Sequence, residues 1–274
     1  MIQDIIVSLA VGRSRDPAVG FAISVAETFD AELAGIAFCY QPVMVGGPMD
    51  AIPAELIESQ RTENTKAARE ALARFKEATA TVDLPAETRT VEAGLDEVPS
   101  TFGRLARTFD LAIVSQSEPE KAGPEERIVE AALFESGRPV IVVPYIQKNG
   151  LKLDRVLVCW DGSRTAARAL ADAMPLLECA KSIEIVTVGN GHEGDNAHFA
   201  SVEKHLARHG LAAEVKQITT DVDVASAILS HAADSSADFI VMGGYGHSRL
   251  REFILGGVTR GILSSMTVPV LMSH

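Results

Sequence analysis

The segment VMGGYGHSRLREFILGGVTRG, from Val241 to Gly261, gathers six glycines and three arginines. Glycine has no β-carbon, so its backbone can adopt positive φ angles and approach a bulky anion closely. Free N–H groups at the start of a helix also attract phosphate oxygens. The glycines suited to this role are Gly243, Gly246, Gly256 and Gly257. Arg249, Arg251 and Arg260 either add positive charge there or face solvent on the helix flank. The segment therefore favours a phosphate-binding loop ahead of a helix.

Residues that could carry catalysis are sparse. The pattern G-x-x-x-x-G-K-[ST] is absent, and no lysine lies in the glycine segment. His247 could polarise a phosphoryl group or act as a base, and the alternative is a surface histidine. His192, Asp195 and His198 are spaced like metal ligands, but no fourth ligand is visible, so we interpret them as a solvated loop. The sequence predicts no catalytic residue and no metal ligand, and leaves at most a slow ATPase open.

Composition and charge exclude several classes of protein. A net charge of −12 repels nucleic acids and anionic membranes, so neither is an expected partner. No apolar stretch approaches the roughly 18 residues that cross a bilayer. The start MIQDIIVSLAVGRSRD lacks the pattern of a secretory signal, so a cytoplasmic location is expected. Cys39, Cys159 and Cys179 show no C-x-x-C spacing and are expected to be small buried hydrophobes.

The two halves of the chain repeat one pattern. IIVSLAVGRS, from Ile5, matches VLVCWDGSRT, from Val156, and DLAIVSQS…RPVIVVPY matches DFIVMGGY…VPVLMSH. Near-continuous apolar strands alternate with helical patterns, which is typical of parallel strands covered on both faces. The polar link QKNGLK, residues 147–152, contains an Asn-Gly turn signal and marks the boundary. The sequence predicts an α/β protein with two tandem doubly wound parallel-sheet domains, residues 1–146 and 147–274.

The elements of the second half must position the glycine segment. Its strands are expected near 153–160, 182–188, 213–219, 237–243 and 268–272, and its helices near 163–178, 196–209, 222–235 and 249–265. In a doubly wound sheet, ligands bind beyond the carboxyl ends of the strands, where the strand order reverses. The loops 159–163 and 243–249 should therefore frame one crevice. Asp161 and Ser163 of the first loop could instead cap the helix that follows.

The glycine spacing resembles a known signature. Gly243-x-x-Gly246, nine residues, then Gly256-Gly257-Val258-Thr259, ahead of the closing strand VPVLMSH, is similar to the nucleotide-binding motif of the universal stress protein family. The repeat extends the resemblance over essentially the whole chain. The chain thus resembles a tandem member, and the resemblance implies Rossmann-like domains of the adenine-nucleotide alpha-hydrolase type.

The resemblance also implies a set of ligand contacts. Asp161 would hold the adenosine end of a nucleotide, Val188 would border the adenine, and Met242 with Gly243 would close that pocket. The residues around the phosphates would be Gly246, His247, Gly256, Gly257, Val258 and Thr259. The expected ligand is ATP, with ADP or AMP as alternatives and Mg²⁺ left open. Gly257 stands where the family usually has Ser or Thr, which removes a hydroxyl donor of about 1 kcal/mol.

The first half lacks these features. Ser115 and approximately Glu118 stand where the second half has Gly243 and Gly246, and Ala10 stands in the place of Asp161. Glu126 and Arg127 replace the Gly256-Gly257 pair. Residues 1–146 carry 23 acidic and 13 basic side chains, against 14 and 12 in residues 147–274. Carboxylates repel phosphates, so the first half is predicted to be a degenerate domain without a nucleotide site.

Three functions follow as hypotheses. The first is a stress-response protein whose nucleotide changes its shape or its choice of partner. The alternatives are a weak ATPase or self-phosphorylating enzyme that uses the same pocket, and a nucleotide-free interaction module. The closing strands, Arg138–Pro144 and Thr267–Ser273, are apolar edge candidates that tend to pair. We expect the halves to pack like two subunits, and a further homodimer of chains is left open.

Overall fold

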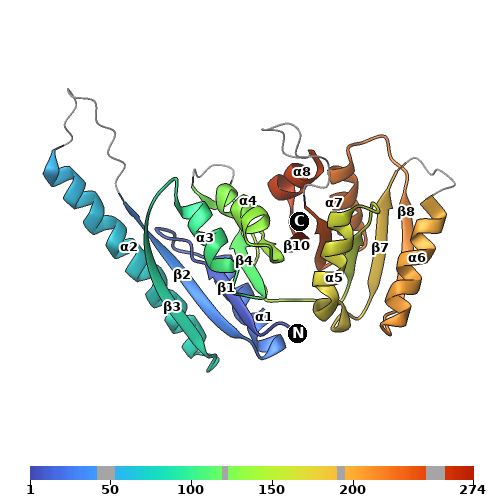
Figure 1. Cartoon of the computed structure of the whole chain (residues 1–274), viewed down its shortest axis with the longest axis horizontal. Helices are drawn as coiled ribbons and strands as arrows, with labels where there is room; N and C mark the ends of the chain where they lie inside the picture. Colours follow the sequence, from blue (N-terminus) through green and yellow to red (C-terminus); the bar gives the residue numbers. More distant parts are fainter. Residues whose placement is uncertain (42–52, 119–122, 190–194, 245–256) are drawn as a thin grey trace. The chain divides into compact units, whose positions relative to one another are not determined.

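The computed structural model describes residues 1–41, 53–118, 123–189, 195–244 and 257–274. The chain divides into two compact units (Figure 1), here called the amino-terminal unit, Ile2–Arg138, and the carboxy-terminal unit, Pro139–His274 together with Met1. No described helix is long and apolar enough to span a membrane.

The amino-terminal unit alternates strands and helices along the chain. Its elements are β1 (Asp4–Ser8), α1 (Pro17–Phe29), β2 (Glu32–Gln41), α2 (Ala54–Ala80), β3 (Ala86–Gly94), α3 (Val98–Ala106), β4 (Leu111–Ser115) and α4 (Glu125–Glu135). The four strands are parallel, in the order β3-β2-β1-β4. The long helix α2 packs along β2 and β3 (Figure 1). Large side chains such as Phe38, Phe75 and Phe102 are fully buried and form the core.

The carboxy-terminal unit repeats this plan with two added strands, β5 and β10. Its elements are β5 (Val140–Val143), β6 (Val156–Cys159), α5 (Arg164–Glu178), β7 (Ile183–Val188), α6 (Asp195–Arg208), β8 (Ala213–Ile218), α7 (Val224–Asp234), β9 (Phe239–Gly243), α8 (Gly257–Ser265) and β10 (Val270–Ser273). Strands β10, β9, β6, β7 and β8 are parallel neighbours in that order. β5 is antiparallel to β10, with Val270 opposite Val142.

These observations confirm the predicted α/β fold of mostly parallel sheets. The strands and helices expected in the second half all have counterparts in the described chain. The last expected helix, residues 249–265, can be compared only from Gly257 onward, because 245–256 lie outside the described residues. The two closing strands do pair, β5 with β10, and β5 groups with the carboxy-terminal unit.

Candidate functional site

The carboxyl ends of β6 and β9 lie side by side in the carboxy-terminal unit. On either side of this pair the sheet continues in opposite chain order, toward β7 and toward β10. This is the switch point at which doubly wound sheets bind ligands. A cavity of about 270 Å³ opens there. Its lining residues are Cys159, Trp160, Asp161, Thr165, Ala166, Val186, Val188, Val224, Ile228, Met242, Gly243, Gly257, Val258 and Thr259.

Seven residues that the sequence singled out line this one cavity. They are Asp161, Val188, Met242, Gly243, Gly257, Val258 and Thr259. The other three, Gly246, His247 and Gly256, lie outside the described residues. The predicted residues thus come from four separate places, the ends of β6, β7 and β9 and the start of α8, and the fold brings them together.

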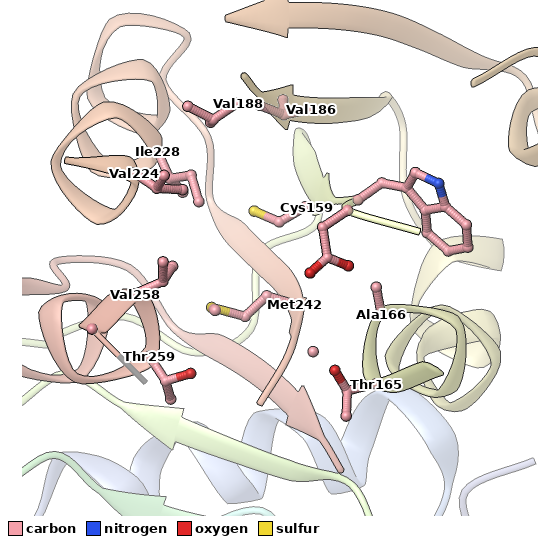
Figure 2. Close-up of a pocket in the computed structure, with 14 residues that line it drawn as sticks. Cys159, Thr165, Ala166, Val186, Val188, Val224, Ile228, Met242, Val258 and Thr259 are labelled. Atoms are coloured by element: carbon pink, nitrogen blue, oxygen red, sulfur yellow. The ribbon is translucent and has the colours of Figure 1, made fainter. Parts of the chain in front are cut away.

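The cavity has an apolar side and a hydroxyl-bearing side. Figure 2 places Val186 and Val188 of β7 near Val224 and Ile228 of α7, with Met242 between this group and the opposite side. The hydroxyl groups of Thr165 and Thr259 lie on that opposite side. They belong to the first turns of α5 and α8. A ligand with an apolar ring and a polar tail would match this division.

The turn between β6 and α5 is built by three residues. Gly162 has a φ of 73°, a left-handed conformation that a β-carbon would strain. The backbone N–H of Ser163 donates to Asp161 Oδ1 at 2.9 Å, and the N–H of Ala166 donates to Ser163 Oγ at 3.1 Å. The capping interpretation is therefore confirmed for Ser163, the N-cap of α5. Asp161 instead supports the turn and lines the cavity, so its carboxylate can also meet a ligand.

Gly243 is needed for packing, which corrects the expectation of a positive φ. It is absent from the described glycines with positive φ, which are Gly12, Gly137, Gly162 and Gly210. A β-carbon on Gly243 would lie 2.5 Å from the backbone N of Ala166 and 2.6 Å from Thr165 Oγ1. Its role is to let the end of β9 touch the first turn of α5.

The start of α8 is open, in contrast to Gly243. A β-carbon built on Gly257 meets no atom within 4 Å, and Gly257 also lacks a positive φ. Thr259, two residues further along α8, is 3% exposed and lines the cavity. Among the described residues, no atom therefore covers the position that a side chain of Gly257 would take at the start of α8.

The cysteines differ from the expectation of three buried side chains. Cys39 is buried, Cys159 is half-buried and Cys179 is exposed. Burial, with a smaller effect of the Asp161 carboxylate, raises the pKa of the Cys159 thiol to about 12. Cys159 is therefore a neutral thiol at physiological pH and a poor nucleophile. Among the described side chains, no group of three or more His, Cys, Asp or Glu could hold a metal ion, and His192, Asp195 and His198 lie outside that set.

The sequence missed the cavity residues that no glycine motif marks. Val224 and Ile228 are one turn apart on α7, so they face β7 together. Their apolar i, i+4 spacing after the third strand was a usable signal. Thr165 and Ala166 had no such signal, because they reach the cavity only through the contact between α5 and Gly243.

The corresponding place in the amino-terminal unit is nearly filled. The ends of β1 and β4 and the start of α4 leave a cavity of about 20 Å³, lined by residues that include Ala10, Ser115 and Glu125. Glu118 lies nearby, in an ion pair with Arg13. Glu126 and Arg127, expected at this place, are exposed instead, because α4 begins at Glu125.

Comparison with known proteins agrees with the sequence resemblance. A model of the universal stress protein family matches residues 152–274. A universal stress protein of Synechocystis sp. is 30% identical over 137 residues, which are 49% of this chain and 46% of that protein. The chain thus spans about half the length of that relative. The stress response protein NhaX of Bacillus subtilis is 25% identical over 162 residues, covering 43% of this chain and 96% of that protein.

Solved structures extend the likeness of fold to the whole chain. The crystal structure of a universal stress protein from Archaeoglobus fulgidus has a TM-score of 0.72 at 17% identity. The structural match covers 98% of this chain and 97% of the Archaeoglobus fulgidus chain. The predicted resemblance is confirmed for residues 152–274, which match the universal stress protein family.

Proposed function

We propose that residues 147–274 bind an adenine nucleotide in the cavity at the ends of β6 and β9, and that residues 1–146 form a domain without a nucleotide site. One observation carries this proposal. Seven of the ten residues that the sequence singled out line a cavity of about 270 Å³, while the matching place in the amino-terminal unit leaves about 20 Å³. The larger volume is close to the lower end of small-molecule sites, about 300 Å³.

The adenine ring would lie on the apolar side of the cavity. Val186, Val188, Val224 and Ile228 supply a surface that excludes water from a flat ring, and Met242 adds a polarisable contact. The Asp161 carboxylate is exposed at the end of β6, where it can accept a hydrogen bond from a ribose hydroxyl or an adenine amino group.

The phosphates would point toward the start of α8. The first N–H groups of that helix have no partner within the helix, and its dipole favours negative charge. Gly257 itself places no side chain over them, and Thr259 adds a hydroxyl. These residues supply binding and orientation. Among the described lining residues Cys159 is a neutral thiol, and we propose regulation by bound nucleotide in preference to catalysis.

The output would be a change of partner or of shape. A ligand shifts an equilibrium only if it binds one arrangement more tightly than another. The cavity wall joins α5, α7 and α8, so a nucleotide that bridges them would favour one relative placement of these helices. A cytoplasmic location and a homodimer of chains also belong to this proposal, and fractionation and sedimentation velocity would test them.

Titration calorimetry with ATP, ADP and AMP, with and without Mg²⁺, tests the binding proposal. Gly257→Glu should weaken ATP binding about tenfold or more, because a carboxylate roughly 5 Å from a phosphate costs on the order of 1–2 kcal/mol at an effective dielectric of about 40. Gly20→Glu, in α1, is the matched control, because a β-carbon there also meets nothing within 4 Å. It should bind ATP like the unmodified protein. Absence of saturable binding at about 1 mM nucleotide would refute the proposal, and phosphate release in the same samples would favour an ATPase.

A further inference from the structure

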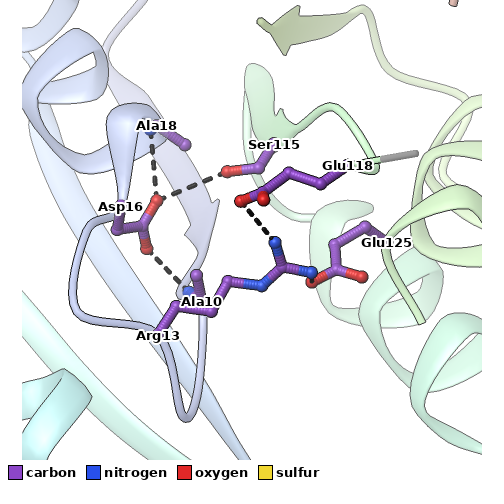
Figure 3. A network of polar contacts seen from close by, with 7 residues as sticks. All are labelled: Ala10, Arg13, Asp16, Ala18, Ser115, Glu118 and Glu125. Atoms are coloured by element: carbon purple, nitrogen blue, oxygen red, sulfur yellow. Dashed lines mark hydrogen bonds and ion pairs between the residues drawn. The ribbon is translucent and has the colours of Figure 1, made fainter. Parts of the chain in front are cut away.

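One arginine of the amino-terminal unit pairs with two carboxylates, one of which, Glu125, lines the small cavity. Arg13 belongs to the loop between β1 and α1. Its Nη1 lies 2.7 Å from Glu118 Oε1, and its Nη2 lies 2.6 Å from Glu125 Oε1 (Figure 3). The three side chains are only 15–26% exposed. The backbone carbonyl of Arg13 also accepts a hydrogen bond from Arg74 Nη2 of α2 at 2.8 Å.

Asp16 holds the same loop to the ends of the strands. Its Oδ2 accepts the N–H of Ala10 at 2.6 Å, and its Oδ1 accepts the N–H of Ala18 at 3.1 Å and the hydroxyl of Ser115 at 3.3 Å (Figure 3). Burial raises the pKa of Asp16, and these hydrogen bonds oppose the rise. The loop is thus tied at Asp16 to the ends of β1 and β4 and at Arg13 to the start of α4.

These tied segments correspond to the parts that frame the open cavity of the other unit. There the matching places are the turn at Asp161, the end of β9 at Gly243 and the start of α8 at Gly257. In the amino-terminal unit the start of α4 carries Glu125, so an internal carboxylate occupies the favourable position for an anion.

The carboxylate of Glu125 creates a need for positive charge. Its Oε2 is buried and has no hydrogen-bond partner in the part of the chain that the structure describes. Burial of the Tyr40 hydroxyl is the main cause that raises its pKa to about 12, and the nearby Glu125 carboxylate adds to this rise. A buried carboxylate without a cation is costly, so the Arg13 guanidinium compensates for Glu125 and Glu118 together.

We propose that Arg13 is the built-in occupant of the amino-terminal crevice, a tethered guanidinium that holds β1, β4 and α4 together in place of a ligand. The chemical preference of this place is opposite to that of the carboxy-terminal cavity: it accepts a cation between two carboxylates. The inference does not depend on nucleotide binding by the other unit.

Hydrogen exchange of the full chain without nucleotide tests this inference. Arg13→Ala should speed exchange at least about tenfold in peptides covering residues 9–18 and 125–130, since removing one partner exposes an unpaired buried charge. Peptides from α5 serve as the internal reference. Arg13→Ala/Glu118→Gln/Glu125→Gln should recover most of the protection, because it removes the unpaired charges as well. Arg13→Lys keeps the charge with fewer hydrogen bonds and should fall between the unmodified protein and Arg13→Ala.

Added divalent cations give a second readout. Mg²⁺ or Ca²⁺ alone, at about 10 mM, should slow exchange of these peptides several-fold in Arg13→Ala and leave the unmodified protein unchanged, since the substitution leaves the Glu125 carboxylate without its cation. Equal exchange in Arg13→Ala and the triple variant would mean that Arg13 only fills space, and would overturn the inference. So would unmodified protection in Arg13→Ala. Neither result bears on nucleotide binding, which is measured separately with Gly257→Glu.

Discussion

The substitution Gly243→Ala should create a severe steric clash in the wall of the cavity. The new β-carbon would lie 2.5 Å from the backbone N of Ala166 and 2.6 Å from Thr165 Oγ1, whereas ordinary contacts begin at 3.4 Å. Relief needs a shift of about 1 Å between β9 and α5, and overpacking of this kind costs about 1–3 kcal/mol. The clash involves backbone atoms at the start of a helix, so rotation of a side chain cannot remove it.

The expected result is a loss of both stability and affinity. The free energy of unfolding should fall by about 1–3 kcal/mol. The shift would also displace Thr165 and Met242, which line the same cavity. ATP should therefore bind about tenfold more weakly, which corresponds to a loss of about 1.4 kcal/mol of binding free energy. Urea unfolding can follow the fluorescence of Trp160, the single tryptophan, which lines the cavity. Calorimetry would measure ATP binding.

Gly257→Ala is the matched control for Gly243→Ala. Both glycines line the cavity, but a β-carbon on Gly257 meets nothing within 4 Å. Its stability should stay the same or rise slightly, since alanine is the better helix former. If Gly243→Ala changed the unfolding free energy by less than about 0.5 kcal/mol, or if both variants behaved alike, the argument from packing would be wrong.

Three further predictions concern other groups of the carboxy-terminal unit. Gly257→Ser should tighten ATP binding up to about fivefold in calorimetry, because the open space admits a hydroxyl worth about 1 kcal/mol. With iodoacetamide at pH 8, mass spectrometry should find exposed Cys179 alkylated while Cys159, with a pKa of about 12, reacts about a thousandfold more slowly. Hydrogen bonds from Ser226 lower the pKa of Asp223, the N-cap of α7. The ionised Asp223 carboxylate therefore stabilises the folded protein above its unfolded pKa of about 4, and this stabilisation is lost as pH falls below that value. Urea unfolding from pH 6 to pH 3 should therefore show a smaller acid loss in Asp223→Asn.

Much of the fold was predictable because the strands are buried on both faces. The runs at β4, β5 and β9 are continuous and apolar, and the helices between them follow a different period. The edge strands β3 and β8 are mostly exposed, yet their place between helices still identified them. The unit to which β5 belongs was not predictable, since it depends on an antiparallel ladder with β10.

The candidate site was predictable where backbone atoms determine the residue type. Gly243, Gly257 and the turn at Asp161 were found because few residue types fit the backbone at these positions. The reason for Gly243 was not predictable, because a contact with Ala166 depends on tertiary packing. In the first half, a shift of one position decided the outcome: Glu125, the first residue of α4, lines the crevice, and Glu126 points elsewhere.

The N-termini of α4 and α8 both favour a negative charge, and the two units differ in what supplies it. The N-terminus of α4 receives the carboxylate of Glu125, which then requires the guanidinium of Arg13. The described part of α8 begins with Gly257, which has no side chain, and in the proposed function a bound anion supplies the negative charge. A single Gly257→Glu substitution copies only half of the closed arrangement, because Arg164, which aligns with Arg13, is exposed on α5 and is not among the residues that line the cavity. That variant should therefore repel a phosphate without becoming as stable as the closed crevice.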